Sequence, residues 1–283
     1  MWDLIVKCDD ICFKHILPRM NSTDVKFLYG VNTETRKLIK RSSRAGDLKK
    51  RFKVQEMSSI STLEVAGEHI SLWLWSRYRL QTYFCWKVAQ TNKLELLKWA
   101  RELSYGCFES CRWDEKTIHA AAYNGNLEMV MYCVANECPI STWACAHAAE
   151  SGHLEILKYL REEVKAPWGW ETATRAAGNG HLHILEYLVE RKYNKYYYYL
   201  ACERAAENGH FDCLKYLHET AKAPWDKEAV RAAHENKHPE CLQYCLDNDC
   251  PLPEGWSYED GELHVPDHSE SESESESDLE SES

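Results

Sequence analysis

The sequence lacks a long uninterrupted apolar run. No stretch approaches the roughly eighteen apolar residues that a membrane-spanning helix requires. The opening stretch MWDLIVKCDDICF is interrupted by Lys7, Asp9 and Asp10, so it does not have the pattern of a secretion signal. We therefore expect an intracellular protein, cytoplasmic or nuclear, that does not contact a membrane.

Motifs for catalysis and for cofactors are also missing. The chain contains no Gly-x-Ser-x-Gly turn, no Gly-rich phosphate loop and no His-Glu-x-x-His helix. No serine or cysteine nucleophile has a partner at a spacing typical of catalysis. The sequence therefore predicts a protein that is not an enzyme and that needs no cofactor.

Basic residues are absent from the end of the chain. From Pro251 to Ser283 there are 12 acidic residues and no lysine or arginine. The formal net charge of the whole chain is −11, so the first 250 residues carry −11 + 12 = +1. A nearly neutral body favours neither nucleic acid nor a membrane surface as a partner.

What the sequence does contain is a repeat. Nearly the same phrase is written three times, as AAESGHLEILKYL, AAGNGHLHILEYL and AAENGHFDCLKYL, and a weaker copy, VAQTNKLELLKWA, begins at Val88. A period in this range is typical of stacked supersecondary units. The alanine pair recurs after 27, 28, 29 and 27 residues, beginning at Ala121, Ala148, Ala176, Ala205 and Ala232.

Each repeat has the pattern of two helices. The segment WACAHAAE is made of small, helix-favouring residues, and Gly152 can then adopt the left-handed conformation that ends a helix. After it, Leu154, Leu157 and Leu160 lie on one face of a second helix. Such a pair cannot bury both of its faces alone, so it requires a copy on each side.

The stretch KTIHAAAYNGN resembles the ankyrin signature, in which a Thr-Pro-Leu-His phrase leads into Ala-Ala and then Gly-His. Ile118 and His119 match the end of that phrase, and Gly125 matches the glycine. The other copies lack the opening phrase and are shorter than the ~33 residues usual for the family. We assign this deficit to the hairpin between units. The resemblance covers roughly residues 84–256, and the repeat domain is expected to span residues 84–260. The resemblance implies an all-α, ankyrin-like solenoid of about six helix-pair repeats: a monomer that binds a protein partner.

The thirteen cysteines mostly follow the repeat. Cys213 and Cys241 stand where other copies have aliphatic residues, so we expect them to pack as small hydrophobes in a reduced protein. The set His234, His238, Cys241 and Cys245 has a spacing compatible with zinc on a helix. His238 is, however, the repeat histidine again, and we expect no metal. We expect the repeat histidines to hydrogen-bond the turn and brace adjacent units.

Residues 1–45 are not repeat and are expected to form a helical segment. Ile16 and Leu17, followed by Asp24, Val25, Leu28 and Val31, have a spacing that resembles an F-box. This resemblance implies docking on a Skp1-like adaptor and a role as substrate receptor of a ubiquitin ligase. The alternative is a helical cap that seals the repeats. The candidate adaptor-binding residues are Ile16, Leu17, Val25, Leu28 and Val31.

Residues 46–83 are expected to form a basic linker and a partial capping unit. Nine basic residues lie between Arg36 and Lys53. They are compatible with a nuclear or nucleic-acid-associated factor, with a solvated helix face, or with a surface that receives the acidic tail. The absence of interleaved aromatic residues argues against nucleic acid.

Aromatic residues mark the connections between repeats. Most connections carry proline and tryptophan, which pack at the seams or serve as partner anchors. The stretch KYNKYYYYL breaks this pattern, and four consecutive tyrosines on a helix cannot all be buried. The candidate partner-binding residues are Trp143, Trp168, Tyr193, Tyr196, Tyr197, Tyr198, Tyr199 and Trp225.

Residues 261–283 are rich in serine and glutamate and have almost no apolar content, so we expect a disordered tail. Five serines have an acidic residue three positions later, which resembles the pattern used by acidophilic kinases such as casein kinase 2. The alternative is a tail that only increases solubility. The candidate phosphorylation sites are Ser269, Ser271, Ser273, Ser275 and Ser277.

Overall fold

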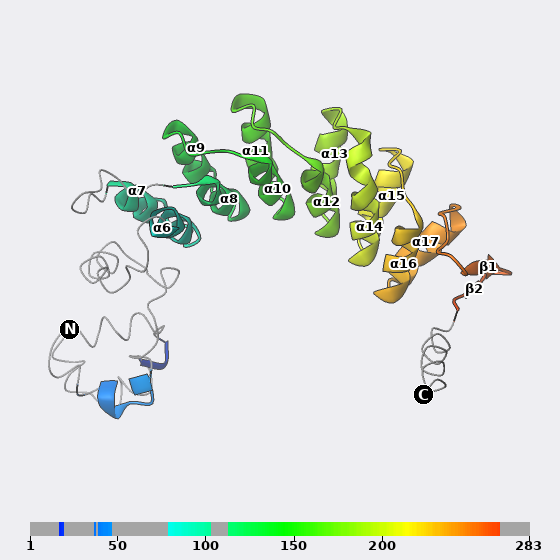
Figure 1. The fold of residues 1–283 in the computed structure, drawn as a ribbon, viewed down its shortest axis with the longest axis horizontal. Helices are drawn as coiled ribbons and strands as arrows, with labels where there is room; N and C mark the ends of the chain where they lie inside the picture. Colours follow the sequence, from blue (N-terminus) through cyan, green and yellow to red (C-terminus); the bar gives the residue numbers. More distant parts are fainter. Residues whose placement is uncertain (1–16, 20–36, 38, 47–78, 103–112, 267–283) are drawn as a thin grey trace, which may run out of the picture. The chain divides into compact units, whose positions relative to one another are not determined.

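The computed structural model describes residues 17–19, 37, 39–46, 79–102 and 113–266 of the 283-residue chain (Figure 1). Leu17 begins a short 3-10 turn, η2 (Leu17–Arg19). Several predicted sites lie outside the described residues. They are the other adaptor-binding candidates, Ile16, Val25, Leu28 and Val31, and all five serines of the acidic tail.

The described chain consists of helix pairs. It divides into two compact units, unit 1 (residues 1–148 and 155–167) and unit 2 (residues 149–154 and 168–283). The helices before the division are α6 (Arg79–Ala89), α7 (Leu94–Glu102), α8 (Glu115–Tyr123) and α9 (Leu127–Ala135). Next come α10 (Thr142–Glu150) and α11 (Leu154–Lys158), which continues into a π-helical turn (Tyr159–Glu163).

Unit 2 continues the same alternation of first and second helices. Its elements are α12 (Trp170–Gly178), α13 (Leu182–Glu190), the 3-10 helix η7 (Lys195–Tyr198), α14 (Tyr199–Glu207), α15 (Phe211–Glu219), α16 (Lys227–Glu235) and α17 (Pro239–Asp247). The first helices α12, α14 and α16 pack side by side, as do the second helices α13, α15 and α17. The described residues therefore form six helix pairs, and the predicted all-α repeat fold is confirmed.

A left-handed residue follows the first helix of every described pair. Four of these residues are glycines with φ of 72° to 74°, and the first and sixth pairs use Asn92 (φ 60°) and Lys237 (φ 59°) instead. A left-handed backbone lets the chain reverse without a long loop. The interval from Asn92 to the first glycine is longer than any interval between the glycines. The glycines are Gly125, Gly152, Gly180 and Gly209.

The sixth repeat is displaced by one residue from its predicted alignment. In the fifth pair the N–H of His210 donates to the carbonyl of Ala205 at 2.8 Å. In the sixth pair His238 donates to Ala233 at 2.9 Å. The structural equivalent of Ala205 is therefore Ala233, not Ala232. The predicted alignment was wrong because the turn residue of the sixth pair is Lys237. The glycine that marks this turn in the preceding four pairs is missing.

A second left-handed residue follows each second helix from the second pair onward. None of these residues is glycine, although the conformation costs a residue with a Cβ atom about 1 kcal/mol. The next residue in each pair is buried and small, except for Tyr193 in the fourth pair. The left-handed residues are Glu137, Lys165, Lys192, Lys222 and Asp249, with φ between 51° and 60°.

Unequal connections explain the drift of the period. The N–H of Tyr193 bonds the carbonyl of Leu188, five residues earlier, whereas the N–H of Ala166 bonds the carbonyl of Leu160, six residues earlier. The π-helical turn Tyr159–Glu163 takes up this extra residue. The fourth connection is longer still, because Tyr193 precedes the helix cap Tyr198 by five residues, whereas Ala166 precedes Gly169 by three.

Small residues fill the space between helix pairs. The first helices bury mainly alanine, which lets neighbouring helices approach closely, while the second helices bury leucine and isoleucine. The nine cysteines that lie in the described repeats are free and buried, so their predicted role as small hydrophobes is confirmed. Burial raises the thiol pKa of Cys145, Cys202 and Cys213 to about 12, which keeps these thiols protonated.

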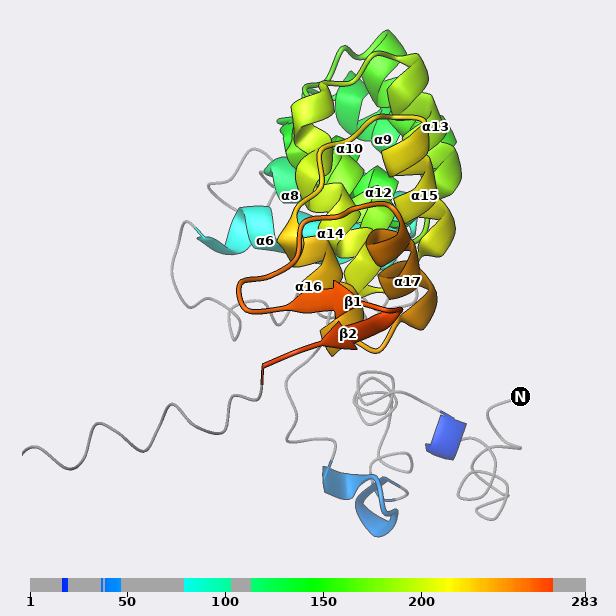
Figure 2. The same cartoon turned by 90° about the vertical axis from the view of Figure 1, so that its right-hand side faces the viewer.

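A small hairpin follows α17 (Figure 2). Strand β1 (Ser257–Glu259) pairs antiparallel with β2 (Glu262–His264), with Tyr258 opposite Leu263. Just before it, the ring of Trp256 contacts His234 of α16 with a centroid separation of 4.9 Å. This hairpin crosses residue 261, where the sequence placed the start of the acidic tail. At the other end, α6 begins at Arg79, before the predicted first repeat residue 84.

Candidate functional site

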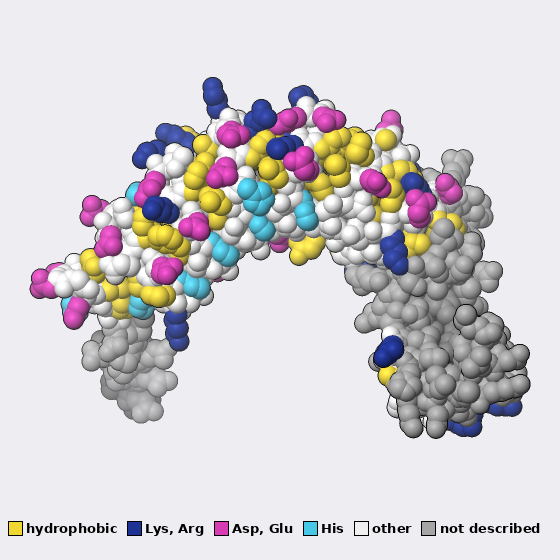
Figure 3. Space-filling view, turned by 180° about the vertical axis from the view of Figure 1, so that it is seen from behind, with side chains coloured by type: hydrophobic (Ala, Val, Ile, Leu, Met, Phe, Trp, Pro, Cys, Tyr) yellow, Lys and Arg dark blue, Asp and Glu magenta, His cyan; other side chains and the backbone are white. Residues whose placement is uncertain are grey.

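The repeat histidines of unit 2 have a structural role. The Nε2–H of His181 donates to the carbonyl of Glu150, the last residue of α10 in the preceding repeat, at 3.0 Å. A methyl group added at Gly180 would meet the imidazole of His210 at 2.8 Å, and Gly152 is covered by His181 in the same way. Histidine side chains, cyan in Figure 3, reach the surface along this unit. The predicted bracing of adjacent repeats by these imidazoles is confirmed for His181.

Two of the predicted contact tyrosines are buried. Tyr193 is only 6% exposed, and its hydroxyl donates to the carbonyl of Gly169. In other repeats a cysteine makes the equivalent bond, since the Sγ of Cys250 lies 3.3 Å from the carbonyl of Asp226. Tyr198 is 2% exposed and packs against Tyr193 at 5.4 Å between ring centroids. These two rings anchor the lengthened fourth connection.

The same connection exposes its other tyrosines. Tyr196 is 67% exposed and Tyr199 is 50% exposed, while Tyr197 is half-buried beside Tyr193. Nζ of Lys195 lies 5.5 Å from the ring centroid of Tyr196, within reach of a cation–π contact. The insertion therefore has an inner side that packs and an outer side that presents aromatic rings.

A tryptophan that the sequence analysis did not single out belongs to the same region. Trp170 begins α12 and is 43% exposed. It precedes Ala176 by six residues, as Tyr199 precedes Ala205, so the two rings occupy equivalent places on adjacent first helices. We call Trp170, Tyr196 and Tyr199 the aromatic patch. The signal was present in the letters WGW, where the second tryptophan departs from the repeat.

The remaining candidate tryptophans of unit 2 lie at seams. Trp168 is half-buried and meets Tyr193 edge-on at 5.0 Å. Trp225 is also half-buried and stacks on His218 with 3.9 Å between ring centroids and 14° between ring planes. Both rings pack within the repeats and are only partly exposed.

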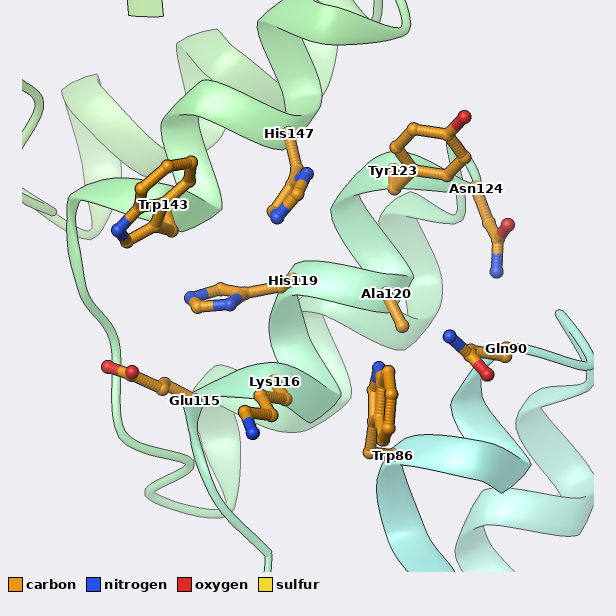
Figure 4. A pocket seen from close by; sticks show the side chains of 10 residues that line it. All are labelled: Trp86, Gln90, Glu115, Lys116, His119, Ala120, Tyr123, Asn124, Trp143 and His147. Atoms are coloured by element: carbon orange, nitrogen blue, oxygen red, sulfur yellow. The ribbon is translucent and has the colours of Figure 1, made fainter. Parts of the chain in front are cut away.

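Unit 1 contains a hollow of about 660 Å³ beside its first helices (Figure 4). We call it the α8 pocket. Trp143, one of the predicted contact residues, forms one wall and is 36% exposed. Half-exposed Tyr123 lies on the other side of His147, and the ring centroids of Tyr123 and His147 are 6.0 Å apart. The lining residues are Trp86, Gln90, Glu115, Lys116, His119, Ala120, Tyr123, Asn124, Trp143 and His147.

The α8 pocket exists because one side chain is small. Ala120 lies immediately before the alanine pair of the second repeat; the third, fourth and fifth pairs have His147, Arg175 and Arg204 at this place, and the sixth has Ala232. A long side chain here would fill the space between Trp86 and His147. Sequence reasoning missed this pocket because an extra alanine beside an alanine pair looks like ordinary helix-favouring composition.

His119 forms the inner wall of the α8 pocket. It is buried, and its Nε2 lies 3.0 Å from the hydroxyl of Ser141, which precedes α10. Burial, together with the neighbouring His147 and Lys116, lowers the pKa of His119 to about 4. The imidazole is therefore neutral at pH 7.

Comparison with known proteins agrees with the repeat geometry. Residues 147–228 match the family of ankyrin repeats in three copies. These residues contain three of the turn glycines and the aromatic patch. The chain therefore carries ankyrin repeats, as the sequence resemblance predicted, and ankyrin repeats indicate a protein–protein interaction domain.

One similar solved structure is the crystal structure of the human ASB11 ankyrin repeat domain. It shares 19% sequence identity with this chain, with a TM-score of 0.42, and the match covers 58% of this chain and 82% of that one. A comparison with curated proteins gave no significant match.

Two further findings concern the described residues alone. None of their helices is both long enough and apolar enough to cross a membrane. They also contain no cluster of three or more histidine, cysteine or acidic side chains arranged to hold a metal ion. His238, from the zinc-compatible set, instead packs its imidazole over Gly209.

Proposed function

We propose that this chain is a non-catalytic scaffold that binds a protein partner through the aromatic patch of unit 2. The observation that supports this proposal is the exposure of three large rings: Tyr196 and Tyr199 in and just after the lengthened fourth connection, and Trp170 at the start of the neighbouring first helix α12. Tryptophan and tyrosine contribute most to protein interfaces because they bury a large apolar area with few rotatable bonds.

The position of the patch supports the same conclusion. Insertions in repeat proteins usually fall in loops on the binding face. Here the buried rings of Tyr193 and Tyr198 anchor the insertion in the core, so the exposed rings already have a fixed position in the unbound protein. A preformed surface loses little conformational freedom on binding, which favours affinity. Trp168, Tyr197 and Trp225 of unit 2 are proposed as secondary contacts, whereas Trp143 belongs to unit 1 and lines the α8 pocket.

The test is a triple substitution, Trp170→Ser with Tyr196→Ser and Tyr199→Ser, in the full chain. Proteins captured from cell extract are compared by mass spectrometry with those captured by the unchanged chain. We expect the specific partner to be lost, because exposed rings contribute binding rather than stability. A control with Met131→Ser and Val265→Ser removes other exposed apolar side chains and should retain the partner. Equal capture by both variants would contradict the proposal.

A second candidate function is a substrate receptor of a ubiquitin ligase. It is supported by the F-box-like residues of the sequence, among them Leu17 and Leu28, most of which lie outside the described part of the chain. The change Leu17→Asp with Leu28→Asp, or a chain starting at Gln55, should lose a Skp1-like adaptor and keep the repeat partner. Retention of the adaptor by the double variant would reject this role.

A further inference from the structure

The α8 pocket is a second surface feature, separate from the aromatic patch in residues and in chemistry. Five rings surround it: Trp86 lies on α6, His119 and Tyr123 lie one turn apart on α8, and Trp143 and His147 lie one turn apart on α10. The ring centroid of His147 is 5.5 Å from that of His119 and 5.9 Å from that of Trp143. These rings form apolar walls, and Ala120 forms the floor (Figure 4).

Positive charge gathers at the Trp86 side of this pocket. Nζ of Lys87 lies 4.3 Å from the ring centroid of Trp86, and Nζ of Lys116 lies 5.8 Å from the same centroid. The Lys87 ammonium also donates to Oε1 of Gln90 at 3.0 Å, which holds it in place. Two ammonium groups beside one ring form an attractive position for an anion.

The single carboxylate of the lining does not oppose this charge at the same place. Glu115 is exposed at the start of α8, and in Figure 4 it extends toward the Trp143 side, away from Trp86. The inner wall shows the same sign of field, since the charge of Lys116 acts to keep a proton off His119. A cation entering the pocket would meet this opposition, whereas an anion would benefit from it.

We propose that the α8 pocket binds an acidic side chain from an extended segment of a partner protein, with the carboxylate beside Lys87 and Lys116 and a neighbouring apolar side chain against Trp143 and Tyr123. The carboxylate supplies the charge that the two ammonium groups attract. The apolar neighbour covers the two half-exposed rings, which contributes the larger part of the affinity. The hollow of about 660 Å³ can hold such a pair of side chains.

The test selects peptides from a random twelve-residue phage library on the immobilised full chain. We expect the selected peptides to be enriched in aspartate or glutamate next to an aromatic or aliphatic residue. Enrichment in lysine or arginine would overturn the proposal, because it would identify the rings as a cation site. Failure to select any peptide above background would overturn it as well.

Substitutions then locate the binding. Ala120→Met fills the pocket without changing its charge, and Lys116→Glu reverses the charge of an exposed side chain without filling it. Each substitution should lower the affinity for a selected acidic peptide by about tenfold or more, measured by fluorescence polarisation. The matched controls are Ala232→Met, at the equivalent place in the sixth pair, and Lys227→Glu, an exposed lysine of α16; both should bind within about twofold of the unchanged chain.

The two proposals fail in distinguishable ways. The triple substitution in the aromatic patch should leave acidic-peptide binding unchanged, because none of its three residues lines the α8 pocket. A selected peptide that is lost in that variant but retained in Ala120→Met binds the aromatic patch, and it would overturn the pocket proposal. Circular dichroism of each variant confirms that the repeats remain folded. If Ala120→Met unfolds the chain, Lys116→Glu alone decides the outcome.

Discussion

At the scale of single residues, the turn between the two helices of a repeat depends on a glycine and on the histidine of the following repeat. Gly209 has a φ of 72°, and the imidazole of His238 lies against the place where a side chain would begin. The glycine therefore serves two needs, a left-handed backbone and room for a ring. Lys237 has a similar left-handed backbone, which shows that the conformation alone does not require glycine.

We predict that Gly209→Ala destabilises unit 2 by about 2 kcal/mol or more. The left-handed strain contributes about 1 kcal/mol, and the added methyl group would lie 2.5 Å from Nδ1 of His238, which requires the ring to move. The free energy of unfolding is measured by urea denaturation. Gly261→Ala is the control, because Gly261 has a φ of 83° but nothing within 4 Å. Equal losses in the two variants would show that the histidine contact contributes nothing.

A second prediction at this scale concerns pH. The pKa of His119 is about 4 in the folded chain, below the ~6.5 of an exposed histidine, so the unfolded state binds the proton more readily. The folded state therefore has its full stability with respect to His119 above pH ~6.5. As the pH falls toward 4, protonation of His119 in the unfolded state lowers the free energy of unfolding, by about 3 kcal/mol at most. Urea denaturation of unit 1 across this range should show the loss. His119→Gln should flatten the pH dependence; an unchanged slope would mean that other groups cause it.

At the scale of elements, the chain adjusts repeats of unequal length without losing their alignment. The π-helical turn Tyr159–Glu163 takes up one surplus residue in the third repeat, and η7 takes up the surplus in the fourth. The two devices differ in consequence. The π turn accommodates its surplus residue within a continuous helix, whereas the insertion around η7 forms part of the connection and exposes Tyr196.

We predict that deleting Glu162 is tolerated, because the π turn can revert to a regular helical turn. The melting temperature should change by only a few degrees, a shift that corresponds to about 1 kcal/mol. Deleting Glu190 is the matched control. It occupies the equivalent place in α13, where no residue is surplus, so its removal should pull Tyr193 out of its buried position. Thermal unfolding followed by circular dichroism separates the two; similar losses would contradict this account of the π turn.

At the scale of the whole molecule, stability is expected to be local. Within unit 2 each helix pair contacts its neighbours along the sequence, so a change at the last pair should not spread far. Trp256 covers His234 at the last described pair, with the β1–β2 hairpin directly after it.

We predict that Trp256→Ser increases hydrogen exchange in α16 and α17 and leaves α12 and α13 unchanged. The reason is that an exposed last pair opens independently of the pairs before it. Hydrogen exchange followed by mass spectrometry measures this pair by pair. A uniform increase over all of unit 2 would show instead that the unit unfolds as a single cooperative body.

The sequence alone determined the repeat, its two helices, the turn glycines and the burial of the cysteines. These features depend on period and on residue size, which can be counted in the letters. It did not determine the alignment of the sixth repeat, because Lys237 stands where other repeats have the glycine that marks the turn. It also did not show that Tyr198 is buried and Tyr196 exposed, because four consecutive tyrosines have no apolar–polar pattern from which the buried side could be predicted.

Only the tertiary structure decided which surfaces exist. The α8 pocket depends on Ala120, and the meaning of that alanine comes from Trp86 on α6 and His147 on α10, both of which lie far from it in the sequence. Stacking of the repeats brings these side chains together around one small residue. A single repeat encodes its own helices, but a hollow between repeats is defined only by the side chains that packing places on its opposite walls.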